Sequence, residues 1–370
     1  MIVGIICFWD RYATPYLLKY EQMLQQAEVQ YEILFWNRES KQSEASFRQQ
    51  GNEVYLDYNC KEGKQKLFSF YGWAKHISRF ITKRKYSHLI LLSTVPAVLL
   101  MPTVMRKYKG KYIFDIRDYT LEKYFIFRKL VMRLVNHSCL TPISSKGFLK
   151  WLDVSPKIIP NHNITVSEDN SFTAPDFSED CPIRFSFVGN VRLDKQTEAM
   201  VRTLGHSSKI KQHYYGRVLS VCNIREIIKE DGLTNVYLHG PFDVKEKETI
   251  YKDTDLINTV YANAEKEEDI PLGDSTPLPN RLYDALIFYR PLVTSKGTYL
   301  AELSDEYHLG VNVNGFDENL EEEIVNYTKT FDRKAFMDGC DKLRALVTEE
   351  ENTFRTKIAQ IFKTWKEDGC

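Results

Sequence analysis

Two basic side chains follow a glycine at the end of an apolar run in the second half of the chain. The stretch "FVGNVRLDKQ" (187–196) places Gly189 directly after a predicted strand, with Arg192 and Lys195 on the turn that enters a helix. Glycine lets a ligand approach the backbone closely, and two cations at a helix amino terminus can neutralise a diphosphate. The alternative is a solvated loop that carries two bases.

A second polar group lies within "LPNRLYDALIFYRPLVTS" (278–295). Pro279 suits the first turn of a helix, so Asn280 and Arg281 are expected at the positive end of the helix dipole. Asp284 follows about one turn later and could accept hydrogen bonds from two vicinal hydroxyls, such as those of a ribose. The alternative is a surface carboxylate on a core helix.

The first half of the chain offers a further set of charged residues at strand ends. In "KYIFDIRDYTLEKYF" (111–125), a predicted strand ends at Asp115, Arg117 and Asp118. One carboxylate could orient a reacting hydroxyl while the arginine positions it, but a buried Arg–Asp pair that holds a loop is an equal alternative. Arg11, in "FWDRY" (8–12), ends the first strand and is either a substrate contact or a surface charge.

The elements that must position these residues alternate along the chain. Short apolar runs are separated by segments of helical spacing, which is typical of parallel sheets covered by helices. Residues 166–182 contain few apolar side chains and predict a linker. We therefore predict an α/β fold of two Rossmann-like domains, residues 1–165 and 183–345, that face each other across a cleft. Residues 346–370 are expected to form a C-terminal helix that could cross back to the first domain.

Bulk properties exclude several classes of protein. Seven scattered cysteines without a C-x-x-C pair argue for reduced thiols in the cytoplasm and against a zinc site or a disulfide framework. The opening residues form a strand pattern without a basic leader, and the longest apolar run (89–101) is too short to span a bilayer.

Charge is distributed unevenly although its sum is zero. Residues 1–165 hold 25 Lys and Arg against 13 Asp and Glu, which leaves 25 against 37 for the remainder. The segment 121–137 predicts a helix that is apolar over more than one face, and bases cluster at 82–86 and 105–112. Together these features predict that the first domain lies on an anionic membrane surface, although ordinary burial of the helix would also explain its pattern. A nucleic-acid partner is not expected, because the bases of the first domain lack interleaved aromatic residues on a recognisable motif.

Several motifs resemble those of the family 4 glycosyltransferases. Pro279, Asp284, Pro291 and Val293 match "P-x-x-x-x-E-A-M-A-C-G-x-P-V-V", with Asp284 in place of glutamate, and Thr276 stands where the family has an earlier glutamate. Lys195 stands at the family's spacing from Gly189 in "V-G-R-L-x-x-x-K", while the arginine is displaced to Arg192. Residues 111–125 and "PISSKGFLKWLDVSPKIIPNHN" resemble a bacterial surface-polysaccharide branch of this family.

The resemblance implies a GT-B fold and a hexosyltransferase-type activity that retains anomeric configuration and uses neither metal nor cofactor. The donor would be a nucleotide-diphosphate sugar bound by Gly189, Arg192, Lys195, Asn280, Arg281 and Asp284. The acceptor would be a saccharide, lipid-linked, used in surface or capsular polysaccharide synthesis at the inner face of the cell membrane. Asp118, Asp115 and Arg117 would be the catalytic group, and Arg11 would contact the acceptor. The alternatives are a sugar-nucleotide epimerase or hydrolase and a non-enzymatic nucleotide-sugar-binding protein.

Overall fold

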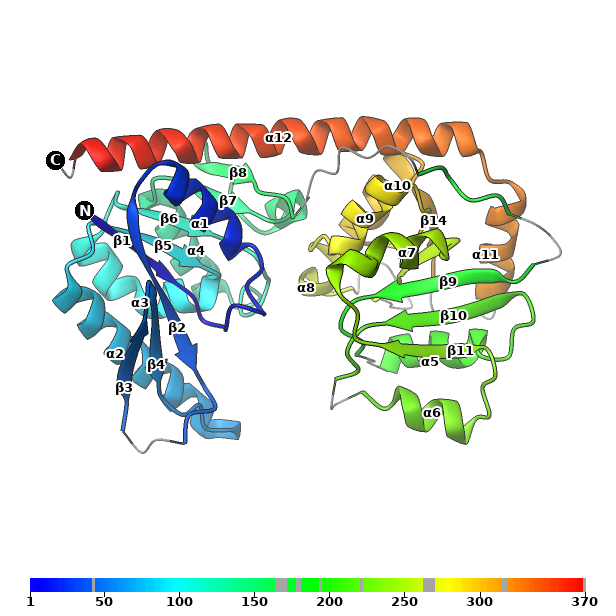
Figure 1. The fold of residues 1–370 in the computed structure, drawn as a ribbon, viewed down its shortest axis with the longest axis horizontal. Coiled ribbons are helices and arrows are strands. Elements are labelled where there is room, and N and C mark those ends of the chain that lie inside the picture. The colour runs from blue at the N-terminus through cyan, green and yellow to red at the C-terminus, as the bar shows by residue number, and fades with distance from the viewer. Residues whose placement is uncertain are drawn as a thin grey trace. The chain divides into compact units, whose positions relative to one another are not determined.

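The chain divides into two compact units. Unit 1 comprises Met1–Asn163 together with Glu349–Cys370, and unit 2 comprises Ile164–Thr348. The computed structural model describes residues 1–41, 44–163, 172–177, 181–192, 195–219, 222–261, 270–314 and 319–368. For residues 195–197 and 368 it describes the backbone and not the side chains. Each unit is built around its own six-stranded sheet (Figure 1).

The sheet of unit 1 has the strand order β3-β4-β2-β1-β5-β6. All neighbours are parallel except β3 and β4, which are antiparallel. Its strands are β1 (Ile2–Ile6), β2 (Gln30–Asn37), β3 (Ser46–Gln50), β4 (Glu53–Asp57), β5 (His88–Leu92) and β6 (Tyr112–Asp115). The central strands form because their runs of Ile, Leu and Val are buried on both faces, as a parallel sheet requires.

Helices cover both faces of this sheet. They are α1 (Leu17–Gln26), α2 (Lys66–Arg84), α3 (Thr94–Lys107) and α4 (Phe125–His137), with 3₁₀ turns at Gly63–Gln65 and Lys146–Lys150. α1 connects β1 to β2, whereas α2 and α3 lead to β5 and β6 in the opposite direction along the sheet, so right-handed crossovers place α1 on the face opposite to α2 and α3. A small parallel sheet of β7 (Thr141–Ile143) and β8 (Ile158–Pro160) completes the unit.

The sheet of unit 2 is entirely parallel, with the order β11-β10-β9-β12-β13-β14. Its strands are β9 (Ile183–Val188), β10 (Ile210–Tyr215), β11 (Val236–Gly240), β12 (Leu256–Thr259), β13 (Leu292–Ser295) and β14 (Gly310–Val313). Its helices are α5 (Lys195–Leu204), α6 (Ile224–Glu230), α7 (Lys247–Lys252), α8 (Leu272–Ser275), α9 (Asn280–Phe288), α10 (Tyr299–Glu306) and α11 (Leu320–Lys329), with a 3₁₀ turn at Val244–Glu246. The prediction of an α/β fold with two Rossmann-like domains is confirmed.

One long helix, α12 (Arg333–Asp368), ends the chain and contributes to both units. Its early side chains, including Phe336 and Leu343, pack into the core of unit 2. Its later ones, including Phe354, Ile358 and Phe362, recur at about one turn and pack into the core of unit 1. None of the described helices is both long and apolar enough to cross a membrane.

Candidate active site

Glycines stand at the carboxyl ends of neighbouring strands in unit 2. Gly189 follows β9 with a φ of +147°, and Gly216 follows β10 with a φ of +138°. The Gly189 amide donates to the Tyr215 carbonyl at 2.9 Å. A Cβ added to Gly216 would stand 1.8 Å from the Gly189 carbonyl oxygen, so this close approach of two chain segments requires glycine. The predicted Gly189 turn therefore lies at the edge of the sheet where α/β proteins bind ligands.

Arg281, from the first turn of α9, reaches this glycine turn. Its guanidinium lies 4.0 Å from the centroid of the Phe187 ring, and its Nη1 donates to the Val188 carbonyl at 3.3 Å. The Arg281 Nε is buried and has no hydrogen-bond partner among the described residues. Burial lowers the pKa of Arg281 from its ordinary value. The structure thus brings two predicted donor-site residues, Gly189 and Arg281, close together. The Arg281 guanidinium is a desolvated cation that still has an unused hydrogen-bond donor.

The structure gives fewer contacts for Arg192 and Lys195, the other two bases predicted for this site. Arg192 is exposed just after Val191, which pairs with Val218 of the neighbouring segment. Lys195 is the first residue of α5, but its side chain lies outside the described part of the chain. The prediction that Lys195 contacts a diphosphate therefore remains a prediction.

The amino end of α9 follows Pro279, and no side chain among the described residues caps it. Asn280 is the first helical residue, so Pro279, expected in the first turn, lies one position before the helix. The Leu282 amide donates to the Pro279 carbonyl at 3.0 Å. Thr276, at the position of the family's earlier glutamate, is completely buried and its hydroxyl donates to the Leu272 carbonyl at 2.5 Å. The Thr276 hydroxyl is therefore already engaged within its own turn.

Asp284 is buried and holds two partners from α7. Lys247 Nζ donates to its two carboxylate oxygens at 2.8 and 3.0 Å, and the Tyr251 hydroxyl donates to Oδ2 at 2.8 Å. Burial, followed by the charge of Asp284, raises the pKa of Tyr251 well above its ordinary value. The carboxylate thus already uses three of its about four acceptor sites. Lys247 and Tyr251 were missed from the sequence, although their spacing of four residues places them on one helix face.

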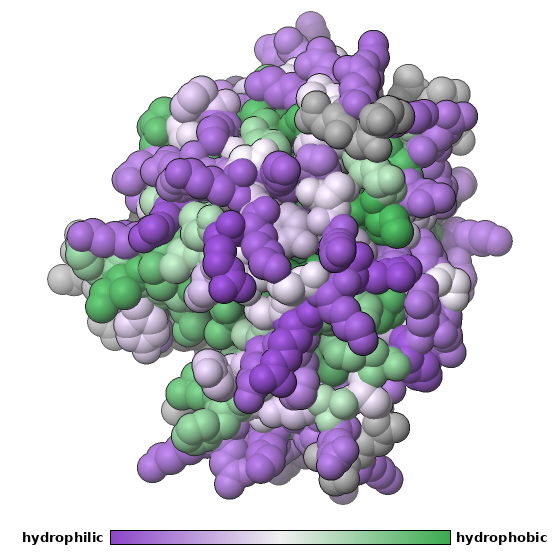
Figure 2. All heavy atoms as spheres, turned by 90° about the vertical axis from the view of Figure 1, so that its left-hand side faces the viewer, coloured by the Kyte–Doolittle hydropathy of each residue, from purple (hydrophilic) through white to green (hydrophobic). Residues whose placement is uncertain are grey.

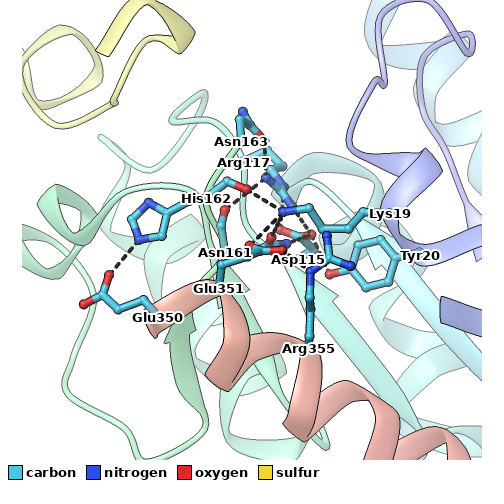
Figure 3. A network of polar contacts seen from close by, with 10 residues as sticks. All are labelled: Lys19, Tyr20, Asp115, Arg117, Asn161, His162, Asn163, Glu350, Glu351 and Arg355. Carbon is cyan, nitrogen blue, oxygen red and sulfur yellow. Dashed lines mark hydrogen bonds and ion pairs between the residues drawn. The ribbon is translucent and has the colours of Figure 1, made fainter. Parts of the chain in front are cut away.

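In unit 1, Asp115 and Arg117 form a buried ion pair at the carboxyl end of β6 (Figure 3). Arg117 Nε lies 2.8 Å from Asp115 Oδ1, and Arg117 Nη2 donates to Oδ2 at 2.8 Å. The Tyr20 hydroxyl and the Asn161 amide donate to the same Oδ2 at 2.6 and 3.2 Å. This geometry matches the buried-pair alternative. Asp118, three residues after Asp115, is exposed and is the group of the three that can meet a substrate.

The ion pair belongs to a larger polar network that includes α12 (Figure 3). Lys19 Nζ donates to Asn161 Oδ1 at 3.1 Å, to the His162 carbonyl at 2.5 Å and to Glu351 Oε2 at 2.9 Å. His162 Nε2 lies 2.6 Å from Glu350 Oε2. These contacts anchor the segment around residue 162 to α12, so His162 has a structural role.

A buried acid that sequence reasoning missed lies in the loop after the ion pair. Glu122 is completely buried, and its carboxylate accepts hydrogen bonds from the Thr94 hydroxyl and the Thr120 amide. The loop that carries Asp118 is thereby held between β6 and the start of α3. No spacing in the sequence signals this contact.

Arg11 is already paired in this structure. Its guanidinium contacts Glu21 and Glu53, at 2.5 Å each, and 43% of its side chain remains exposed. The ion pairs favour the surface-charge alternative, and an acceptor contact would have to compete with two carboxylates. Within the described residues, no group of three or more His, Cys, Asp or Glu side chains is placed to hold a metal ion.

Known proteins resemble this chain in structure and not in sequence. No protein family and no curated protein matches the sequence. Sucrose-phosphate synthase from Thermosynechococcus elongatus matches with a TM-score of 0.72 at 12% identity, over 98% of this chain and 100% of that chain. A lipopolysaccharide outer core galactosyltransferase matches with a TM-score of 0.64 at 12% identity, over 97% and 99%. Anabaena HepE, solved with UDP and glucose, matches with a TM-score of 0.59 at 12% identity, over 98% and 100%. The fold is therefore that of the GT-B class.

Proposed function

We propose that this chain is a glycosyltransferase that takes a sugar from a nucleotide-diphosphate sugar. The observation that carries the proposal is the contact of Arg281 with the Gly189 turn, which joins two motif segments at the carboxyl edge of one parallel sheet. A half-buried guanidinium whose buried Nε has no hydrogen-bond partner among the described residues suits a diphosphate beside a glycine turn, because charge-assisted hydrogen bonds are strong in a desolvated site. The GT-B fold and the solved neighbour that binds UDP and glucose support it.

In the proposed reaction, the bond between the donor sugar and its diphosphate breaks while the acceptor hydroxyl forms the new bond. Arg281, Arg192 and Lys195 would stabilise the charge that develops on the leaving diphosphate, assisted by the amino end of α9. Asp284 would hold the ribose, and Asp118 would orient the acceptor hydroxyl. Asp115 and Arg117 would act through the loop that they hold. Retention of configuration and independence of metal are part of the proposal and rest on family resemblance.

The proposed acceptor is a saccharide carried on a lipid, and the proposed setting is surface polysaccharide synthesis at the inner face of the cell membrane. The excess of bases in residues 1–165 supports an anionic surface as partner. Likeness to a lipopolysaccharide galactosyltransferase is compatible with a hexosyl donor and a lipid-bound acceptor.

One observation favours a second candidate, a nucleotide-sugar-binding protein without transfer activity. Thr276 is buried and bonded to Leu272 where the family has a glutamate, so that position gives no carboxylate to a donor sugar. Binding with no product would support this candidate.

The test is a calorimetric panel of UDP, GDP and ADP followed by assays with the corresponding nucleotide sugars. We expect one nucleoside diphosphate to bind and its sugar nucleotide to lose sugar to an acceptor or slowly to water. Absence of binding by every nucleotide in the panel would refute a donor site of this kind.

A further inference from the structure

The first turns of α2 expose three large apolar side chains. Leu67 is 73% exposed, Phe68 is 75% exposed and Tyr71 is 70% exposed. They stand at positions i, i+1 and i+4 and therefore share one side of the helix. Single apolar residues on a surface are ordinary, and the face in Figure 2 shows hydrophobic residues in small patches among hydrophilic ones. Three neighbours exposed by more than two thirds form a patch that needs an occupant.

A second patch lies at the start of α4. Tyr124 is 56% exposed, Phe125 is 61% exposed and Ile126 is 73% exposed. The sequence predicted a helix over 121–137 that is apolar on more than one face, and Phe125 and Ile126, which lie outside its core stripe, are exposed. Burial within unit 1 therefore does not explain them.

The two patches lie at the same edge of unit 1. α2 follows β4 and α4 follows β6, and the parallel strands β4 and β6 end at one edge of the sheet. α3 packs against both helices and lies between them. The distance from α2 to α4 across α3 is two interaxial distances between packed helices, so the patches lie about 20 Å apart. A single peptide groove does not have this form, whereas a flat surface can meet both patches at once.

Cations surround each patch. Residues 58–75 contain Lys61, Lys64, Lys66 and Lys75 against one acid, Glu62, and no ion-pair partner of these lysines is found in the described part of the chain. Lys66 lies 5.8 Å from the Phe70 ring centroid. Aromatic side chains with lysines beside them are typical of surfaces that enter the headgroup region of anionic lipids.

At the second patch the cations also lie on aromatic rings. Lys129 Nζ lies 4.4 Å from the centroid of Phe125, and Lys123 Nζ lies 5.3 Å from that of Tyr124. The only acid in this segment, Glu122, is buried and bonded. The exposed charge here is therefore positive.

We propose that unit 1 docks on the surface of an anionic bilayer through these two patches, defined as Leu67, Phe68 and Tyr71 on α2 and Tyr124, Phe125 and Ile126 at the start of α4. The inference deepens the proposed function, since a bilayer is where a lipid-linked acceptor would be met. The apolar side chains enter the interfacial region, and the lysines contact the lipid phosphates.

This location differs from the one that the basic clusters indicate in the sequence. Lys83 and Arg84 lie in the last turn of α2, about 24 Å along the helix from Leu67. Lys107 ends α3 at the same far edge of the sheet, and Arg84 is paired with Glu32. Those bases lie well beyond one Debye length, about 8 Å, from a bilayer that contacts the patches. They are therefore not the groups that decide docking.

The test compares binding of the full chain to sedimented vesicles of phosphatidylglycerol and of phosphatidylcholine. The variants are Leu67→Ser/Phe68→Ser/Tyr71→Ser, Phe125→Ser/Ile126→Ser, Lys83→Gln/Arg84→Gln/Lys85→Gln/Lys107→Gln and the control Val154→Ser/Val244→Ser. The control residues are 93% and 76% exposed and lie outside the patches. We expect binding to phosphatidylglycerol only, weakened at least about tenfold by each patch variant. The control and the fourfold glutamine variant should bind within about twofold of the parent, because their changes lie outside the contact.

Three results would overturn the docking proposal. They are absence of parent binding to anionic vesicles, equal binding by the patch variants, and loss of binding only in the fourfold glutamine variant. A parent that sediments as a dimer while the patch variants are monomers would show that a second copy covers the patches. Calorimetry of UDP, GDP and ADP without vesicles separates the two proposals, since a docking failure leaves nucleotide binding intact and a donor-site failure leaves docking intact.

Discussion

The carbonyl oxygen of Gly189 stands 1.8 Å from the position that a Cβ of residue 216 would occupy. The obstructing atom belongs to the backbone of the adjoining strand end, so it cannot move aside as a flexible side chain would. The turn proposed to hold the donor phosphates is therefore fixed by the packing of two glycines.

Gly216→Ala should destabilise unit 2 and weaken nucleotide binding. The clash and the positive φ together should cost at least about 2 kcal/mol in the free energy of unfolding, measured by urea titration. Gly232→Ala is the matched control, because its φ is +61° and a Cβ there would meet nothing within 4 Å. The control should lose only about 1 kcal/mol. Equal losses would show that the close approach is not a constraint.

Arg281→Met should weaken binding of the nucleoside diphosphate that the parent binds, with little loss of stability. A charge-assisted hydrogen bond contributes about 1.5–3 kcal/mol, which corresponds to a tenfold to hundredfold change in Kd by calorimetry. Methionine retains contact with Phe187 and removes the charge. Arg333→Met, which removes a surface ion pair with Asp176, is the control. An unchanged Kd for Arg281→Met would place the phosphates elsewhere.

Asp284 is expected to contribute to the free energy of unfolding through its pairing with Lys247, and to the affinity for a nucleotide through the ribose. Asp284→Ala leaves the Lys247 ammonium and the Tyr251 hydroxyl without their shared acceptor. Its cost in the free energy of unfolding should therefore exceed that of the double variant Asp284→Ala/Lys247→Met, which removes the unpaired ammonium as well. In binding, Asp284→Ala should weaken the nucleoside diphosphate and its sugar nucleotide equally. A 2′,3′-dideoxy nucleotide that binds the parent as well as its ribose form would disprove the ribose contact.

The fold could be predicted because strands such as β1 and β5 are almost entirely apolar. Ile2–Ile6 and His88–Leu92 are buried on both faces, so burial alone determines their pattern. β3, "SFRQQ", was not predicted, because all five of its residues are exposed and its strand state depends on antiparallel pairing with β4. Edge strands of this polar kind have no periodic signal.

The sequence could indicate individual residues of the site but not which of them contact one another. Gly189 and Arg281 each stood out by type and spacing, but their contact spans more than ninety positions and depends on the packing of α9 against β9. The same applies to Asp115, whose partners Tyr20 and Asn161 come from distant elements. A sequence shows which groups can do chemistry, whereas long-range packing decides which of them remain available to a substrate.

The surroundings of His213 lead us to expect that the folded protein loses stability in mild acid. Its Nδ1 lies 3.0 Å from His239 Nε2, and burial, together with His239, lowers its pKa from 6.5 to about 4. Between these values the unfolded chain binds a proton that the folded chain does not, so the free energy of unfolding falls as pH falls through this window. The loss should be about 1–2 kcal/mol, less than a fully buried histidine would give, because the ring is partly exposed.

His213→Gln should therefore flatten the dependence of the urea midpoint on pH between about 7 and 4.5. Glutamine keeps a polar side chain on β10 but does not titrate. His206→Gln, at an exposed position, should keep the slope of the parent. A parent whose midpoint does not change with pH would show that His213 titrates normally in the folded state.

Lys19→Met should strongly destabilise unit 1. The side chains of Lys19 and Glu351 are 11% and 4% exposed, so both charges of this pair have largely left water. Burial accordingly lowers the pKa of Lys19. Removing the lysine leaves a buried carboxylate whose one remaining charged partner among the described residues is Arg355. The expected cost is about 2–4 kcal/mol in the free energy of unfolding.

The double variant Lys19→Met/Glu351→Leu should recover much of this loss, because it leaves no unpaired charge in the buried network. Urea unfolding followed by tryptophan fluorescence would report on unit 1, since Trp73 and Trp365 lie in its core. Arg355→Met, which removes the more exposed partner of Glu351, should cost less than Lys19→Met, because Lys19 still pairs with the carboxylate. If the double variant is no more stable than Lys19→Met alone, the contacts of Lys19 with Asn161 and with the His162 carbonyl, and not its pairing with Glu351, hold the segment to α12.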